Sequence, residues 1–417
     1  MAIPSLQPGS HSSLIFDQYN QVRVLWKMRP LGVQSVARGG KGGMMQAVFH
    51  HRLHWAFLCA VALGMVLASS ARADVQYNII DLGTMGGISS SPSKINALGQ
   101  VAGDFYLNAN VYHAFLYSNG TMQDLGTLGG PTSGGQGIND VSQVVGTSDT
   151  SNGQYHAFLY SNGTMQDLGT LGGSNSLGVA INHSGQVVGE AETVTSGTFL
   201  HAFIYSNGKM QDLGAFDGVE SHARAINDAG QVTGFSTVGG GYHAFLYANS
   251  SMQDLGTLGG SGSEGMSINS AGQVAGFSLI SNNTNYHALL YSDGVMKDLG
   301  TLGGTDSFAW GMNDAGQVVG SADMSDGNEH AFIYTNGTLE DLNSLLVNPN
   351  TGWVLRGASD INDTGQIVAF GLINREYHAF LLTPTPEPGA GAIVLGTIGG
   401  FHLLRRRPSA CVAKTRP

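Results

Sequence analysis

Short runs in which apolar and polar residues alternate recur along most of the chain and predict strands rather than helices. The clearest run, His-Ala-Phe-Leu-Tyr at 156–160, places Ala and Leu on one face and His, Phe and Tyr on the other. Both faces are apolar enough to pack between neighbouring sheets. Ser-Asn-Gly follows at 161–163, and it predicts a tight hairpin because Asn and Gly tolerate positive φ. The partner strand, Met-Gln-Asp-Leu, then covers 165–168.

This pattern occurs seven times, and three landmark residues mark each unit. A histidine begins one strand at His113, His156, His201, His243, His287, His330 and His378. An aspartate ends the partner strand at Asp81, Asp124, Asp167, Asp212, Asp254, Asp298 and Asp341. An asparagine follows Ile or Met at Asn96, Asn139, Asn182, Asn227, Asn269, Asn313 and Asn362. Successive histidines are 43, 45, 42, 44, 43 and 48 residues apart, so the repeat is one supersecondary unit.

Each unit contains two hairpins, hence four short strands, which is the content of a propeller blade. The first strand, at 77–81, has the pattern of a fourth strand, and the last, at 378–382, has that of a third strand without a partner. The sequence therefore predicts an all-β fold, a seven-bladed β-propeller of four-stranded blades closed by the N-terminal strand. The alternative is an open β-solenoid, which would need capping units at its ends.

The landmarks are interpreted as structural rather than catalytic. A catalytic site needs one asymmetric arrangement of groups, whereas these groups recur in every unit. We expect a buried hydrogen-bond network in which each His bonds an Asp and each Asn satisfies backbone groups of its turn. No catalytic, cofactor-binding or metal-ligating residue is predicted, and the protein is expected not to be an enzyme. Calcium at Asn-Asp turns such as 139–140 and 227–228 is a weaker alternative, because no known calcium-loop spacing is present.

Charge and cysteine content narrow the possible partners. Residues 74–383 hold 27 acidic and 6 basic residues, so the repeat region would repel phosphate backbones, and nucleic-acid binding is not expected. The two cysteines, Cys59 and Cys411, lie outside this region, which leaves it without disulfides or thiolate metal sites.

The N-terminal segment, residues 1–73, has the features of a leader and a secretory signal peptide. A basic stretch at 50–54 precedes an apolar run at 55–68 that is shorter than the roughly 20 residues of a membrane span. Small residues at Ala71 and Ala73 predict signal-peptidase cleavage after Ala73. An uncleaved anchor is the alternative, and Met44 or Met45 is a candidate start. Export through the Sec pathway is expected.

The C-terminal segment, 384–417, combines Pro386-Glu387-Pro388, an apolar stretch at 389–404 and the cluster Arg405, Arg406 and Arg407. A short apolar helix followed by arginines should halt in a membrane with the arginines on the cytoplasmic side. The three parts in this order resemble the PEP-CTERM sorting tail. That resemblance implies an exosortase-type processing enzyme as a partner and a place in the envelope of, or outside, a Gram-negative bacterium. The extension 408–417 departs from the family pattern, and a plain tail anchor is the alternative.

The repeats themselves resemble the HAF repeat family of exported bacterial proteins. The resemblance rests on His-Ala-Phe, on Asp-Leu-Gly-Thr-Leu-Gly-Gly and on Asn-x-x-Gly-Gln, and it covers 77–382. It implies an extracellular location and a propeller or related β-repeat fold, with no established activity. Three departures are Ser142 in place of a turn Gly, Leu289 in place of Phe, and the crossing 214–218.

Function is expected where the units differ. The segments 148–155, 190–200 and 279–286 vary most and are read as loops on one face, with tyrosines just before several histidines. Their polar composition suits glycans, so the leading hypothesis is an exported, envelope-associated binding or structural scaffold for extracellular polysaccharide or a surface partner. The alternative is a propeller enzyme acting on glycans, which should show one cluster of inward acidic, His or Arg side chains. Arg224, Arg356 and Arg375 are basic candidates too scattered to assign.

Overall fold

A computed structural model describes residues 75–193, 199–281, 283–349, 352–373 and 376–385. The chain divides into two compact units, 1–71 and 72–417, and all described residues belong to the second. The predicted signal segment, and the predicted sorting tail from Pro386 onward, lie outside the described residues. Within the part that is described, no helix has the length and apolar character needed to cross a membrane.

The described fold is all-β and consists of four-stranded antiparallel sheets, each with a first, second, third and fourth strand. The first strands are β2 (Ser89–Ile95), β6 (Gly129–Ile138), β10 (Gly172–Ile181), β14 (Ser221–Ile226), β18 (Gly259–Ile268), β22 (Gly303–Met312) and β26 (Val354–Ile361). The second strands are β3 (Val101–Asn108), β7 (Val144–Thr150), β11 (Val187–Thr193), β15 (Val232–Val238), β19 (Val274–Ile280), β23 (Val318–Met324) and β27 (Ile367–Ile373). The third strands are β4 (Val111–Ser118), β8 (Tyr155–Ser161), β12 (Leu200–Ser206), β16 (Gly241–Ala248), β20 (Tyr286–Ser292), β24 (Glu329–Thr335) and β28 (Glu376–Pro384). The fourth strands are β5 (Thr121–Asp124), β9 (Thr164–Asp167), β13 (Lys209–Asp212), β17 (Ser251–Asp254), β21 (Val295–Asp298), β25 (Thr338–Asp341) and β1 (Tyr77–Gly83). A short 3-10 helix, η1 (Leu342–Leu345), follows β25.

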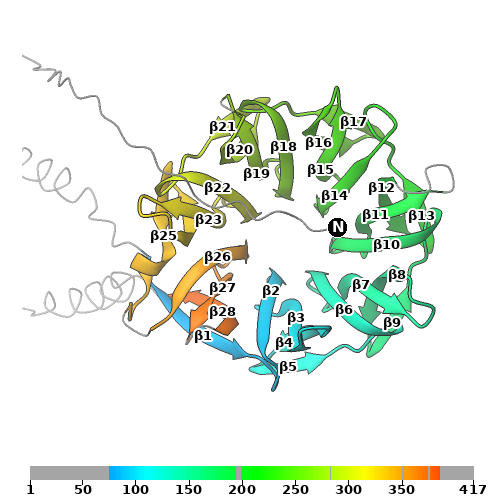
Figure 1. Cartoon of the computed structure of the whole chain (residues 1–417), viewed down its shortest axis with the longest axis horizontal. Coiled ribbons are helices and arrows are strands. Elements are labelled where there is room, and N and C mark those ends of the chain that lie inside the picture. Colours follow the sequence, from blue (N-terminus) through cyan, green and yellow to red (C-terminus); the bar gives the residue numbers. More distant parts are fainter. Residues whose placement is uncertain (1–74, 194–198, 282, 350–351, 374–375, 386–417) are drawn as a thin grey trace, which may run out of the picture. The chain divides into compact units, whose positions relative to one another are not determined.

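The sheets follow one another around a centre, with the first strand of each sheet innermost and the fourth outermost (Figure 1). Strand order places β14–β17 and β18–β21 in one eight-stranded sheet, but a single parallel pair, Tyr242 with Gly262, joins the two sets. Four-stranded sheets arranged radially in this way are the architecture of a β-propeller.

The first described strand pairs with the last. β1 lies antiparallel to β28, with Tyr77 opposite Pro384 and Ile79 opposite Leu382. The sheet β1-β28-β27-β26 thus combines one strand from the start of the described chain with three from its end. Because β1 occupies the edge beside β28, that edge does not stand open to another chain.

The core lies between successive sheets. In the third strands the Phe of His-Ala-Phe is fully buried, as in Phe158 and Phe245, and the preceding Ala is equally buried on the opposite face. Leu289, which replaces Phe in one unit, is also fully buried, so the substitution preserves an apolar contact at smaller volume. Alternating burial on both faces explains why neither face of these strands is strongly polar.

Two sequence departures change the backbone only locally. Ser142 adopts φ 64°, the left-handed conformation that glycine occupies at the same turn in other units. After the unusual crossing 214–218, β14 has six residues, whereas β10 and β18 have ten each.

Candidate functional site

Each landmark histidine lies beside the landmark aspartate of its sheet. His156 Nδ1 is 2.8 Å from Asp167 Oδ2, and His378 Nδ1 is 2.9 Å from Asp81 Oδ2, which joins β28 to β1. In six units the same carboxylate also accepts the N–H of the glycine two residues later, as Asp167 does from Gly169 at 2.8 Å. These bonds tie the third strand to the fourth and to the turn that follows it.

The expectation that these pairs are buried is wrong. The aspartate side chains of the pairs are 19–43% exposed and the histidines 15–25%. The fourth strands are the outermost strands of the sheets, so their carboxylates remain in contact with solvent (Figure 1). An exposed pair of this kind contributes at most about 1 kcal/mol to stability.

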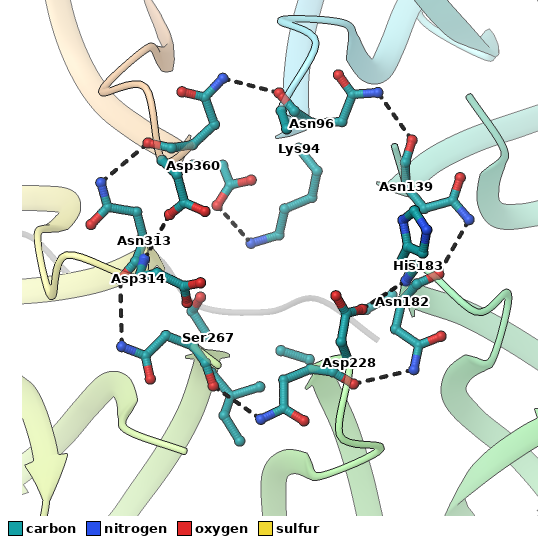
Figure 2. Close-up of a pocket in the computed structure, with 18 of the residues that line it drawn as sticks. Lys94, Asn96, Asn139, Asn182, His183, Asp228, Ser267, Asn313, Asp314 and Asp360 are labelled. Carbon is teal, nitrogen blue, oxygen red and sulfur yellow. Dashed lines mark hydrogen bonds and ion pairs between the residues drawn. The ribbon is translucent and has the colours of Figure 1, made fainter. Parts of the chain in front are cut away.

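The landmark asparagines, in contrast, are buried and link the units to one another. Asn96 Nδ2 donates to the backbone oxygen of Asn139 at 3.0 Å, and Asn139 Nδ2 donates to that of Asn182 at 3.2 Å. The series continues through Asn227, Asn269, Asn313 and Asn362, and Asn362 Nδ2 donates back to Asn96 at 3.0 Å. Figure 2 shows this circle of hydrogen bonds, which we call the asparagine circle.

The asparagine circle surrounds a cavity of about 270 Å³. Lys94 and Asp360 extend into the same region and form an ion pair at 3.3 Å (Figure 2). Asp360 Oδ2 also accepts the Ile95 N–H at 3.2 Å. Burial raises the pKa of Asp360, and the Lys94 ammonium opposes that shift. Because Lys94 belongs to β2 and Asp360 to β26, the ion pair joins these two strands.

The Asn-Asp turns use their carboxylates within the fold. Asp140 Oδ1 accepts the N–H of Ala97 at 2.8 Å, and Asp228 Oδ1 accepts that of His183 at 2.9 Å. Each bond joins one unit to the next. In the described ranges, no three His, Cys, Asp or Glu side chains form a group able to hold a metal ion.

A β-bulge occurs at the same place in every first strand, three residues before the landmark asparagine. The pairing with the second strand skips one residue there, for example Arg224 between Ala223 and Ala225. We call the seven skipped residues the channel positions: Ser93, Gln136, Val179, Arg224, Met266, Trp310 and Ser359. All of them line two adjoining central cavities of about 460 and 350 Å³. Bulges re-aim side chains in this way.

One side of the larger cavity carries a cluster of charged side chains, the charged cluster, from three neighbouring sheets. Glu190 of β11 contacts both His222 Nδ1 and Arg224 Nη1 of β14, the latter at 3.4 Å. Arg224 Nε lies 4.0 Å from Glu264 Oε2 of β18. Burial raises the pKa of Glu264, whereas the charges of Arg224 and His222 act to lower it.

Another part of the wall of this cavity is apolar and aromatic. Phe277, Met266 and Trp310 line it together with the charged cluster. Trp310 stacks on Phe308 at 5.8 Å, and Phe277 meets both rings edge to face. The arrangement is asymmetric, since the channel positions other than Arg224, Met266 and Trp310 hold Ser, Gln or Val.

Sequence reasoning missed this cavity. The sequence predicts loops at 190–200 and 279–286. Glu190 instead lies in β11 and lines the cavity, and Leu279 is buried in β19. The sequence assigns no role to Arg224, but the structure places it in the charged cluster. Arg356 lies in β26 and lines none of the three central cavities. Arg375 lies outside the described residues. The available signal was the residue three positions before each landmark asparagine, which varies from Ser to Arg and Trp between neighbours that are mostly Gly or Ala.

Comparisons with known proteins identify no relative by sequence. No family model matches the chain. No curated protein matches it either. Among solved structures, the chain is similar to TolB from Acinetobacter baumannii (13% identity, 69% of this chain, 64% of that chain, TM-score 0.41). It is also similar to a gluconolactonase from Xanthomonas campestris (9%, 76% and 93%, TM-score 0.40) and to an acylaminoacyl peptidase from Pyrococcus horikoshii (9%, 78% and 54%, TM-score 0.46). The chain thus spans less than two thirds of the TolB structure, and similarities at this level transfer no activity.

Proposed function

We propose that this chain is an exported, envelope-associated propeller of seven blades, closed by its N-terminal strand, that serves as a non-enzymatic scaffold for extracellular polysaccharide or a surface partner. The observation that supports the proposal is that recurring and varying residues have different roles in the structure. Side chains that recur in every unit bond strands or units together, whereas side chains that differ between units line the two larger central cavities. Variation on a rigid frame is the arrangement that binding sites use.

The seven-bladed, closed form is supported by two sets of contacts. β1 pairs with β28, and Asn362 of the last unit bonds Asn96 of the first. An open solenoid would leave both of these without partners. The resemblance to HAF repeats is consistent with the same form.

Export is proposed from the two terminal segments. N-terminal sequencing of the protein recovered from a Gram-negative envelope fraction should begin at Asp74, and replacing Ala71 and Ala73 by Arg should leave the full-length chain. Recovery of an intact N-terminus from the unmodified chain would instead indicate an anchor.

Processing by an exosortase-type enzyme is proposed from Pro386-Glu387-Pro388 and Arg405–Arg407. Co-expression with such an enzyme should shorten the C-terminus, and replacing Pro386 and Pro388 by Ala should prevent the shortening. An unchanged mass in the presence of the active enzyme would contradict the proposal and favour a plain tail anchor.

Polysaccharide binding is tested by applying the full chain to a glycan array. We expect binding to at least one bacterial extracellular glycan, because a large acidic propeller with a polar, aromatic channel offers both hydrogen bonds and ring contacts. Silence on every glycan would remove the polysaccharide version of the scaffold and leave the surface partner.

A glycan-cleaving enzyme is the second candidate, and the charged cluster favours it. Glycoside hydrolysis commonly uses two carboxyl groups in different environments, one of them protonated as a general acid. Glu264 has a raised pKa, and Glu190 is held by His222 and Arg224. Release of reducing ends from a bound glycan that is lost in Glu264→Gln, with binding retained, would support this candidate.

A further inference from the structure

The channel positions hold side chains of widely different size and polarity. In chain order they are Ser, Gln, Val, Arg, Met, Trp and Ser, whereas the residues on either side of them are mostly Gly or Ala, with Pro92, Lys94, Ser267 and Asp360 as the exceptions. A bulged residue has no partner in the neighbouring strand, so its replacement leaves the ladder intact. The channel positions are therefore where this repeat can specialise without losing its fold.

The larger cavity has two chemically opposite walls. Trp310, Phe277 and Met266 present carbon and sulfur atoms, whereas Glu190, Arg224 and Glu264 present charged hydrogen-bonding groups. A sugar ring has the same division, since its C–H face is apolar and its hydroxyls both donate and accept. At about 460 Å³ the cavity falls in the range, roughly 300–1,000 Å³, of small-molecule sites.

Two hydrogen-bonding atoms in the wall of the same space have no partner in the described part of the chain. Gln136 Oε1 and Thr147 Oγ1 are buried without a hydrogen-bond partner among the described residues, and both residues line the larger cavity. Buried polar atoms of this kind are costly unless something bonds them. A ligand hydroxyl can donate to the Gln136 oxygen and accept from the Thr147 hydroxyl.

Charge limits which saccharides fit. Two carboxylates and one guanidinium line the larger cavity, and the repeat region is strongly acidic as a whole. A uronic acid would bring a third carboxylate beside Glu190 and Glu264, which already share the single guanidinium of Arg224. A neutral sugar avoids that repulsion.

We infer that the central cavity lined by Arg224, Trp310 and Gln136 binds one or two residues of a neutral saccharide, so that the channel and not the outer loops recognises the glycan. This inference rests on the proposed function and names its site. Tyrosines that precede the landmark histidines, such as Tyr377, are then dispensable for saccharide binding. Tyr377 lies at the start of β28 rather than in a loop and is 50% exposed.

The chain offers an internal reporter for the test. It contains four tryptophans, Trp26, Trp55, Trp310 and Trp353, of which Trp310 lines the cavity. In the full chain with the other three replaced by Phe, cellobiose, maltose or lactose should change the Trp310 fluorescence saturably. Glucuronic acid should have no effect at the same concentrations.

Single substitutions in the otherwise unmodified full chain identify which residues bind the disaccharide. Trp310→Ala and Gln136→Leu should each weaken binding of the active disaccharide about tenfold or more, or about 1.4 kcal/mol, by calorimetry. The Gln136 oxygen bonds no other described residue, so Gln136→Leu leaves no group of the protein unpaired. This variant therefore tests the site even if Trp310→Ala folds poorly. The control Tyr377→Ala should bind as the unmodified chain does.

Two outcomes separate this inference from the proposed function. Binding of glycans on the array with unchanged Trp310 fluorescence, or loss of binding in Tyr377→Ala but not in Gln136→Leu, would overturn the channel site and leave the scaffold proposal standing. Silence of every glycan and every disaccharide would overturn the channel site together with the polysaccharide version of the scaffold.

Discussion

Single side chains hold this molecule together through unusually complete hydrogen bonding. Asn227 Nδ2 donates to Gln231 Oε1 at 2.8 Å and to the Asn269 backbone oxygen at 3.0 Å. Its Oδ1 accepts the N–H groups of Ala229 and Gln231. One buried amide therefore closes its own turn and joins the next unit, which explains why only Asn occupies this position.

Replacing Asn227 by Asp should destabilise the fold by about 2–4 kcal/mol, because a carboxylate cannot donate and would face two acceptors in a buried site. Urea unfolding measures the change. Asn207→Asp is the matched control, since Asn207 lies at an exposed turn where another unit already has Asp293. Equal unfolding midpoints for the two variants would contradict the role assigned to the asparagine circle.

Asp104 makes the stability depend on pH. Desolvation raises its pKa from 3.8 to about 7, although a hydrogen bond from the Gly135 N–H acts in the opposite direction. The folded state therefore binds a proton more tightly than the unfolded state, and this contribution to the free energy of unfolding falls as pH rises from about 4 to about 7.

Asp104→Asn should keep the hydrogen bond from the Gly135 N–H and should remove the fall in the free energy of unfolding as pH rises. The variant should match the unmodified chain near pH 4 and exceed its stability by up to about 4 kcal/mol at pH 8. Thermal unfolding across this range, with Asp293→Asn as the control, checks the prediction. A stability difference independent of pH would show that Asp104 is ionised in the fold throughout.

At the scale of the strand, the bulge that frees each channel position demands glycine in the strand opposite. A Cβ built on Gly103, Gly146, Gly189, Gly234, Gly276 or Gly320 would lie 1.8–2.2 Å from a backbone oxygen of the first strand. The last unit has Ala369 there instead, and in that unit the register of β26 against β27 shifts twice. The glycines are thus a consequence of close backbone approach.

Gly189→Ala should cost more than about 3 kcal/mol, since the new methyl group meets Leu177 O at 1.9 Å and the backbone must move. Ala369→Gly, the reverse change in the last unit, should cost about 1 kcal/mol or less. Denaturant unfolding of both variants decides the point, and similar losses for the two would refute the steric explanation.

At the scale of the whole molecule, the two ends of the described chain support each other. Thr385 N donates to Gln76 O at 2.8 Å, and Tyr77 and Leu82 of β1 are buried at 3% and 8% exposure. The Lys94–Asp360 pair bonds the first unit to the last near the centre. The start and the end of the described chain are therefore joined by one contact at the rim and another near the centre.

Deleting residues 75–83 should leave β28 as an unpaired edge and produce aggregates, because an exposed strand edge recruits other chains. A peptide of residues 75–85 added during refolding should restore the monomer by strand addition, measured by size-exclusion chromatography. The same peptide with Tyr77 and Leu82 replaced by Asp serves as the control and should not. A deleted chain that remains monomeric and as stable as the full chain would argue against closure by β1.

The sequence alone determined the strands, the repeat and the identity of the landmark residues, because alternation, turn residues and a fixed period are local properties of the chain. It also placed a fourth strand before the first complete unit. It could not reveal that the His-Asp pairs stay partly exposed while the asparagines are buried and bond one unit to the next. Burial depends on the distance of each strand from the centre, and that distance is set only when the sheets assemble.

The candidate site was decided by tertiary structure. Glu190, Arg224, Glu264 and Trp310 belong to four different units and are separated by 34 to 46 residues in sequence, so no local pattern connects them. Arg224 and Trp310 reach the centre as the bulged residues of their own strands, whereas Glu190 and Glu264 lie near the bulges of their sheets, at Val179 and Met266. A period in the sequence specifies equivalent places, but only the circular arrangement of the sheets turns those places into neighbours.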